Sequence, residues 1–216
     1  MKPLFVILVS YRRLDMLKRT MESLLPTLPT GSQMLIVDNN SPEPEVRAYL
    51  NNLARNPQVR VHYTDNKGWA HAVNTGLDRY SFMWKDFEYV LESNNDVEYK
   101  PNWWPRAKEL METYPQIGIL GLWKSIHHGL RKQFPDGLMI KDNMPACAWL
   151  FRSKDLEGFL PFPEKGPTKQ RGGNGEDCDV VGNVQATGKW VCGVHPDLAT
   201  HLDGYDNPEG DNPAYV

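Results

Sequence analysis

Residues 89–97 read Tyr-Val-Leu-Glu-Ser-Asn-Asn-Asp-Val, a short apolar run that ends in two amides and a carboxylate. Such a run is typical of a central strand in an α/β sheet, where helices cover both faces. Open α/β sheets bind ligands beyond the carboxyl ends of their strands, where Asn94, Asn95 and Asp96 would lie. Amide and carboxylate oxygens suit Mg²⁺ or Mn²⁺, ions that usually bind together with phosphate groups. The same residues are ordinary turn formers, so this stretch alone predicts either an ion site or a turn.

The composition favours one globular domain. The 216 residues are 40% hydrophobic and 11% aromatic, which is enough for a core. With 24 basic and 27 acidic residues the net charge is −3, so no strong attraction to nucleic acid is expected. No apolar run reaches the roughly 18 residues of a membrane span, so stable membrane insertion is not expected. Cys147, Cys178 and Cys192 are odd in number and lack metal-ligand spacing, which favours reduced thiols and a cytoplasmic protein.

Strand and helix patterns alternate along the first half of the chain. Apolar or alternating runs predict strands at 4–9, 34–37, 59–63 and 89–93, and three-to-four spacing predicts helices at 14–28, 43–53 and 69–77. This order favours a parallel, doubly wound sheet. The second half predicts helices at 101–114, 153–156 and 176–187, strands at 117–123, 146–151 and 189–194, and a hairpin or loop at 125–143. Residues 163–175, rich in Gly and Pro, predict a loop.

Several motifs follow the predicted strands in a fixed order. They are residues 9–12 (VSYR), residues 36–41 (IVDNNS), Asn66-x-Gly68 with Asn74-x-Gly76, Asn94-x-Asp96, and Glu176-Asp177-x-Asp179. Together they resemble the family 2 glycosyltransferases, which use nucleotide sugars. Residues 146–152 and 201–204 resemble the family's strand before the acceptor site and its late His-containing segment.

The resemblance implies an α/β protein of the GT-A (Rossmann-like) fold, a single domain over residues 1–216 with a mostly parallel central sheet flanked by helices. Residues 4–100 would form the nucleotide-sugar-binding half, 101–204 the acceptor-side half, and 205–216 a polar tail. The implied reaction moves a sugar from a nucleotide-diphosphate sugar, with UDP the expected nucleotide, to an acceptor hydroxyl with inversion.

On the nucleotide-sugar side, the first two loops would bind the nucleotide. Ser10 and Tyr11 would line the nucleobase pocket, and Asp38 would accept a hydrogen bond from the nucleobase or ribose. Arg12 would meet phosphate or only start the next helix. The alternative is that Asp38 only shapes its turn. The remaining expected contacts to the nucleotide sugar are Asn66, Gly68, Asn74, Asn94 and Asn95. Gly76, inside a predicted helix, is explained equally well by close packing of that helix on the sheet.

The metal and the chemistry are assigned by the resemblance. Asp96 would bind Mn²⁺ or Mg²⁺. His201 would be a further ligand or a phosphate contact, and the alternative is an ordinary, partly buried His. Asn94 stands where the family usually has Asp, and its weaker amide ligand would instead contact ribose or coordinate through water. Asp177 would be the general base, with Glu176 beside it. Both acids also open a predicted helix, where the dipole favours carboxylates regardless of chemistry.

Other interpretations remain open at this stage. The loop 163–175, with three cationic side chains, would act as a lid over the bound nucleotide sugar, or be an ordinary surface loop. A non-catalytic nucleotide-sugar or sugar-binding module is the first alternative function. A sugar nucleotidyltransferase is the next, although the Gly-rich phosphate loop that it needs is missing after the first strand. The acceptor could be a saccharide, a glycolipid, a protein or a modified nucleobase, and the oligomeric state is not readable.

Overall fold

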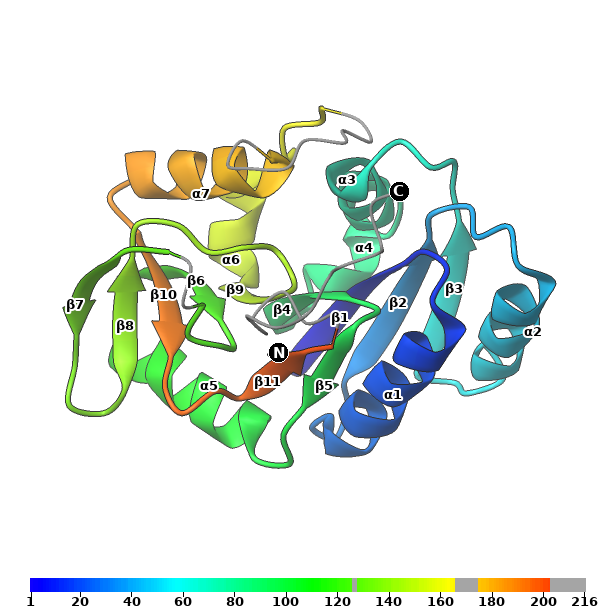
Figure 1. Cartoon of the computed structure of the whole chain (residues 1–216), viewed down its shortest axis with the longest axis horizontal. Helices are drawn as coiled ribbons and strands as arrows, with labels where there is room; N and C mark the ends of the chain where they lie inside the picture. Colours follow the sequence, from blue (N-terminus) through cyan, green and yellow to red (C-terminus); the bar gives the residue numbers. More distant parts are fainter. Residues whose placement is uncertain (126–127, 166–174, 203–216) are drawn as a thin grey trace, which may run out of the picture.

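The computed structural model describes residues 1–125, 128–165 and 175–202, and Figure 1 shows their arrangement. The strands are β1 Lys2–Ser10, β2 Gln33–Asp38, β3 Val59–Tyr63, β4 Phe87–Asn94, β5 Val97–Tyr99, β6 Ile117–Gly121, β7 Leu130–Gln133, β8 Leu138–Lys141, β9 Ala148–Arg152, β10 Trp190–Val194 and β11 Ala199–His201. The helices are α1 Leu14–Leu24, α2 Pro44–Leu53, α3 Trp69–Arg79, α4 Ser81–Trp84, α5 Trp103–Thr113, α6 Ser153–Leu156 and α7 Glu176–Ala186, with short 3₁₀ turns at Leu25–Thr27 and Glu157–Phe159.

The first half of the chain forms the predicted parallel sheet. Strand β1 lies between β2 and β4 and runs parallel to both, and β3 runs parallel to β2. Because the chain must cross over between parallel strands, each connection carries a helix, as the alternating pattern predicts. The register pairs Ser10 with Asp38 and Val9 with Asn94, so the three strand ends lie at one edge.

The second half of the chain continues the same sheet with mixed strand directions. The described residues form a nine-stranded sheet in the order β3-β2-β1-β4-β9-β6-β10-β8-β7. Strand β9 is antiparallel to β4 and β6, β10 is parallel to β6, and β8 is antiparallel to β10. The α/β class is confirmed, but parallel pairing prevails only in the first half. The weak signal over 125–143 includes a hairpin, β7 with β8, at the far edge of the sheet.

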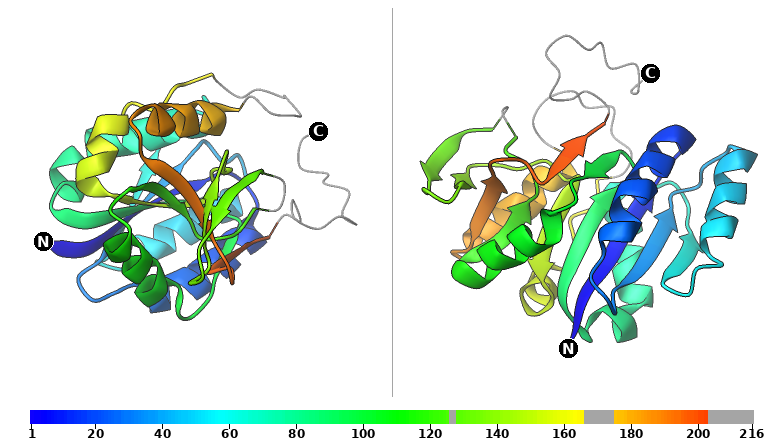
Figure 2. Two further views of the ribbon diagram at one scale, coloured as in Figure 1. Left: turned by 90° about the vertical axis from the view of Figure 1, so that its left-hand side faces the viewer. Right: turned by 90° about the horizontal axis from the view of Figure 1, so that it is seen from below.

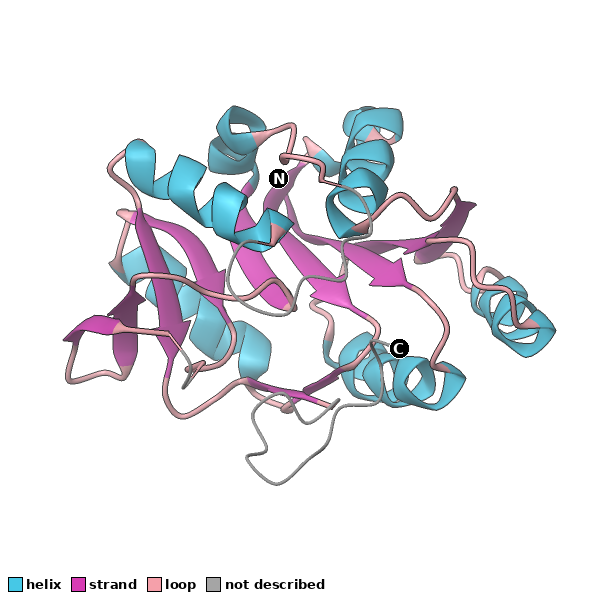
Figure 3. Ribbon diagram, turned by 45° about the horizontal axis from the view of Figure 1, so that its top comes forward, coloured by secondary structure: helices cyan, strands magenta, loops and turns pink. Residues whose placement is uncertain are grey.

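Helices cover both faces of the sheet. Figures 1 and 3 show α3, α4, α6 and α7 on one face and α1, α2 and α5 on the other. The three-to-four spacing in α1 buries Leu17, Met21 and Leu24, as an amphipathic helix should. The sheet is therefore covered on both sides, which explains why β1, β2 and β4 are almost continuously buried.

A second, two-stranded sheet was not predicted from the sequence. Strand β5 follows the Asn-Asn-Asp turn and pairs antiparallel with β11, which brings His201 opposite Val97 (Figures 1 and 2). Helix α1 covers the other edge of β5. There the backbone N–H of Val97 donates to Thr20 Oγ1 at 3.0 Å and that of Tyr99 donates to Ser23 Oγ at 3.0 Å. Three-residue strands carry too little periodicity to be read from sequence.

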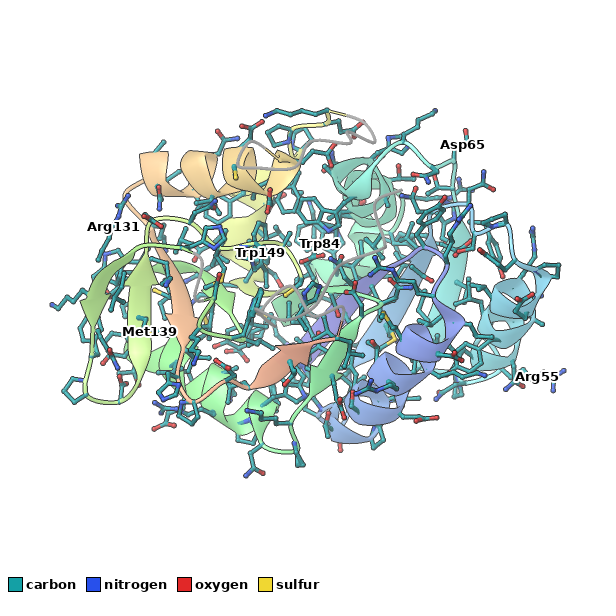
Figure 4. The ribbon with its side chains drawn as sticks, in the orientation of Figure 1. Arg55, Asp65, Trp84, Arg131, Met139 and Trp149 are labelled. Carbon is teal, nitrogen blue, oxygen red and sulfur yellow. The ribbon has the colours of Figure 1, made fainter. Side chains whose placement is uncertain are left out.

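Most of the tryptophans pack in the core, as their number suggested. Trp84, Trp103 and Trp149 are fully buried, and Figure 4 shows Trp84 and Trp149 in the interior, far from Arg55 and Arg131 at opposite ends of the molecule. All three cysteines are free. In the part of the chain that the structure describes, no helix is both long enough and apolar enough to cross a membrane.

Gly76 supplies a test of the helix–sheet packing. A Cβ built at Gly76 would lie 2.8 Å from Ile7 Cδ1 and 2.8 Å from Val37 Cγ2, both on the sheet beneath α3. We expect Gly76→Ala to destabilise the fold by about 1–3 kcal/mol, because the sheet has little room to move. The control is Gly182→Ala in α7, where an added Cβ meets nothing within 4 Å.

We expect Gly182→Ala to stabilise the fold by at most about 1 kcal/mol, because Ala has a higher helix propensity than Gly. Denaturant unfolding measures both variants. Equal effects of the two substitutions would contradict the close packing of α3 on β1 and β2.

Candidate functional site

The loops after β1 and β2 are tied together by one hydrogen-bonded chain. The backbone N–H of Arg12 donates to Ser41 Oγ at 2.8 Å, and Ser41 donates through Oγ and N–H to the two carboxylate oxygens of Asp38 at 2.6 and 3.0 Å. Asp38 is buried, and both of its oxygens are engaged. The turn-shaping role weighed from the sequence is therefore present. Its effect is to hold the first loop against the second.

The first loop presents two side chains outward. Arg12 and Arg13 both have φ of 55°, a left-handed conformation that costs non-glycine residues about 1–2 kcal/mol. Tyr11 is 36% exposed, and the Arg12 guanidinium lies 5.3 Å from its ring centroid. Buried Asn95 braces this conformation by donating from Nδ2 to the carbonyl oxygen of Arg12 at 3.0 Å. Of the residues predicted to bind the nucleotide, Tyr11 and Arg12 are thus accessible to a ligand, whereas Asn95 is buried and stabilises the backbone of the first loop.

The loop before α3 is fixed by amides and by one glycine. Asn39 Nδ2 donates to Asn66 Oδ1 at 3.1 Å and to the Gly68 carbonyl at 3.3 Å. Gly68 has φ of +108°, which requires glycine, and α3 begins directly after it. The structure therefore brings Asn66 and Gly68 next to the end of β2.

Asn74 lies elsewhere. Its Nδ2 donates to the Phe162 carbonyl at 2.8 Å and to Glu164 Oε1 at 2.9 Å, and its Oδ1 accepts from the Phe162 N–H at 2.8 Å. The side chain anchors residues 162–164 to α3. Its hydrogen bonds in this structure are structural ones.

The two predicted metal ligands converge, although 105 residues separate them in the sequence. Asp96 Oδ1 lies 3.4 Å from His201 Nε2, and the backbone N–H of Leu202 donates to the Asp96 carbonyl at 2.7 Å. Asp96 Oδ2 is bound by Arg13 Nη1 at 2.6 Å, so the carboxylate carries a cationic partner in this structure. Asn94 is half-buried, and its Nδ2 donates to the Ala146 carbonyl at 2.9 Å.

Asp96 and His201 suit a divalent ion only as part of a ligand set. Over residues 1–125, 128–165 and 175–202, no group of three or more His, Cys, Asp and Glu side chains is placed to hold a metal. One carboxylate and one imidazole fit an ion that takes its other ligands from phosphate and water, as Mg²⁺ commonly does.

The two acids that open α7 have different environments. Glu176 is buried: its Oε2 accepts from the Ala70 N–H at 2.8 Å, in the first turn of α3, and its Oε1 accepts from the Lys165 N–H at 2.7 Å. Asp177 is half-buried, and its Oδ1 accepts from the Cys178 N–H at 2.9 Å. Glu176 therefore joins the N-termini of α3 and α7, and Asp177 is left at the accessible position beside it.

Residues 166–174, most of the predicted lid, lie outside the described residues, as does the predicted tail 205–216.

One residue of the site was missed from the sequence. Glu92 lies in the middle of β4 and is 1% exposed, and its Oε1 accepts from Trp69 Nε1 at 2.7 Å. Burial raises the pKa of Glu92 to about 8, against the lowering effect of the Trp69 hydrogen bond and with smaller raising contributions from the charges of Asp96 and Asp177. The available signal was a carboxylate directly after the apolar residues 89–91 of a predicted central strand.

The raised pKa makes a prediction about stability. The folded protein keeps the Glu92 proton up to about pH 8, whereas the unfolded chain releases it near 4.5. The stabilisation is complete below pH 4.5 and is lost as the pH rises through about 8. We expect the melting temperature of the wild type to fall more between about pH 5 and about pH 8.5 than that of Glu92→Gln, which cannot titrate. An equal change of melting temperature with pH in the wild type and in Glu92→Gln would contradict the raised pKa of Glu92.

Several solved structures have a similar fold at low sequence identity. GalNAc-T7 with UDP, GalNAc and Mn²⁺ has a TM-score of 0.71 at 11% identity, over 93% of this chain and 44% of that one. The mannosyltransferase PcManGT from Pyrobaculum calidifontis with GDP-Man and Mn²⁺ gives 0.61 at 15%, over 89% and 56%. TarS residues 1–349 from S. aureus gives 0.65 at 14%, over 94% and 61%. The chain thus has the GT-A fold and spans about half the length of these proteins.

A sequence search of curated proteins gives no match. The model of the family described as glycosyl transferase family 2 matches residues 5–168, which is more than half of the chain. The strand ends that form the site, from Ser10 to Asp96, all lie within that range. The chain therefore belongs to glycosyl transferase family 2.

Proposed function

We propose that this protein transfers a sugar from a nucleotide-diphosphate sugar to an acceptor hydroxyl in a single displacement with inversion. One observation carries the proposal. Asp96, His201 and the loops after β1 and β2 lie together at one edge of the sheet in a family 2 domain. Asp177 opens α7, and its charge acts on the same buried Glu92 as the charge of Asp96 does. The carboxyl edge of a parallel sheet is where such folds bind nucleotides.

The nucleotide would lie over the first two loops. Tyr11 offers a partly exposed ring for stacking, and the Arg12 guanidinium beside it offers charge for phosphate. Asp38 holds the shape of this surface through Ser41. UDP is the nucleotide that we propose, in line with the UDP bound to GalNAc-T7, although PcManGT holds GDP-Man.

Asp96 and His201 would hold Mn²⁺ or Mg²⁺ together with the diphosphate. Such an ion neutralises charge on the leaving diphosphate. The two similar structures that contain a nucleotide or nucleotide sugar also contain Mn²⁺. Arg13 and the buried setting of Asp96 keep this carboxylate in a fixed orientation.

Asp177 is the proposed general base. Its carboxylate would take the proton of the acceptor hydroxyl as that oxygen attacks the anomeric carbon, and the nucleotide diphosphate would leave from the opposite side. Attack opposite the leaving group inverts the anomeric centre. Glu176 has both oxygens engaged by backbone N–H groups, so its role is to position Asp177 and α3.

Residues 4–100 supply the proposed nucleotide-sugar half and 101–204 the acceptor half. The acceptor class stays open between a saccharide, a glycolipid, a protein and a modified nucleobase. A cytoplasmic location is part of the proposal, in keeping with the three free thiols.

Asp96 provides the test of nucleotide-sugar binding. Calorimetry with UDP- and GDP-sugars in the presence of Mn²⁺, Mg²⁺ or chelator should identify one that binds in a metal-dependent manner. We expect Asp96→Asn to weaken that binding by about tenfold or more, because an amide is a weaker ligand than a carboxylate. Asp65→Asn, at an exposed site next to Asn66, is the matched control. Binding that is indifferent to both metal and Asp96 would remove the proposed metal role.

Asp177 provides the test of turnover. We expect Asp177→Asn to lower the rate of nucleotide release from the bound nucleotide sugar, with water or saccharides as acceptor, by about 10²–10⁴-fold. Affinity for the nucleotide sugar should be unchanged. The control is Asp179→Asn, two residues along the same helix, where the carboxylate pairs with Lys165 Nζ at 2.6 Å. Equal rates in wild type and Asp177→Asn would exclude Asp177 as the base.

A further inference from the structure

Glu92 sits on the face of the sheet that α3 and α7 cover. The register pairs it with Ile7 of β1 on one side and with Trp149 of β9 on the other. Paired residues point to the same face, and an added Cβ at Gly76 of α3 would contact Ile7. The Glu92 carboxyl therefore lies between the sheet and these helices, at the base of the candidate site.

Two polar atoms of this cluster lack hydrogen-bond partners. Within the described residues, Glu92 Oε2 and Trp149 Nε1 are both buried and unpaired. The other Glu92 oxygen accepts from Trp69 Nε1, and the ring centroids of Trp69 and Trp149 lie 5.6 Å apart in an edge-to-face contact. An unsatisfied buried donor or acceptor costs about 1–3 kcal/mol, so a bound ligand or water that pairs with both atoms would remove this cost.

A hydroxyl group matches this pair chemically. It can accept a hydrogen bond from the indole N–H of Trp149 and exchange a second one with the Glu92 carboxyl. The raised pKa keeps much of the Glu92 carboxyl neutral near pH 7, which avoids placing an unpaired charge in the core. Trp69 is only partly buried, whereas Glu92 and Trp149 are nearly inaccessible, so Trp69 forms the outer rim of the cluster.

The location of the cluster indicates which hydroxyl it would bind. Glu92 lies two residues before the end of β4, after which the turn with Asp96 begins, and its partner Trp69 adjoins Ala70, which donates to Glu176 beside Asp177. The cluster therefore lies between the turn on the proposed diphosphate side and the start of α7, which carries the proposed base. In a single displacement the sugar being transferred lies between the leaving diphosphate and the attacking hydroxyl. We propose that Glu92 and Trp149, with Trp69 at the rim, form a subsite that selects the transferred sugar through one of its ring hydroxyls. This inference rests on the proposed function.

The test compares sugars that share one nucleotide. Dissociation constants are measured with Mn²⁺ for UDP, UDP-glucose, UDP-galactose, UDP-N-acetylglucosamine and UDP-N-acetylgalactosamine, and likewise for GDP and GDP-mannose. The variants are Glu92→Leu, which removes the carboxyl from a position with apolar neighbours, and Trp149→Phe, which removes the indole N–H and leaves a smaller aromatic ring. Glu92→Gln is the conservative variant, and Glu88→Gln on the same strand is the control. Melting temperatures show that each variant is folded.

We expect the wild type to prefer one sugar. In Glu92→Leu and Trp149→Phe the dissociation constant for that sugar should rise about tenfold, while that for the nucleotide alone stays within about twofold. Glu92→Gln should retain most of the preference. An unchanged sugar preference in both Glu92→Leu and Trp149→Phe would overturn the subsite and leave the proposed function standing. Failure of every nucleotide and nucleotide sugar to bind the wild type would overturn both.

Discussion

The structure depends on the pairing of β4 along both of its edges. Parallel β1 lies on one side and antiparallel β9 on the other, so the ladder fixes the register of Leu91, Glu92 and Ser93 from two directions. A shift by one residue would turn every side chain of the strand to the opposite face. The pairing of β4 with β1 and β9 therefore determines where Glu92 and the turn that carries Asp96 lie.

The site is completed by short elements that the sheet alone does not provide. Strand β11 returns antiparallel to β5 and brings His201 to Asp96, while Arg13 reaches the same carboxylate from the start of α1. Hydroxyls of α1 satisfy the free edge of β5. Because a buried carboxylate needs hydrogen bonds or charged partners, the environment of Asp96 is provided by three separate parts of the chain.

Glu176 and Asp177 show how two neighbouring acids acquire different roles. Both carboxylates lie in the first turn of α7, where the helix dipole favours them. Glu176 is buried and binds backbone N–H groups of α3 and of the segment before α7, so it acts as a structural link between the two helices. Asp177 stays half-buried, and its Oδ1 accepts from the neighbouring Cys178 N–H. Glu176 and Asp177 are chemically similar, so their different roles come from their different burial and hydrogen-bond partners.

The sequence by itself determined the α/β class, most of the strands and helices, and the family motifs, because apolar periodicity and turn residues are local properties. For Gly76 it offered close packing only as one of two equal explanations. The antiparallel half of the sheet, the β5–β11 pair and the anchoring roles of Asn74 and Glu176 were decided only by tertiary structure, because each depends on contacts between distant residues. Glu92 is the clearest case. In the sequence it is one acid in an apolar run, and only the pairing with Trp149 and the hydrogen bond from Trp69 show that its second oxygen is buried at the base of the site.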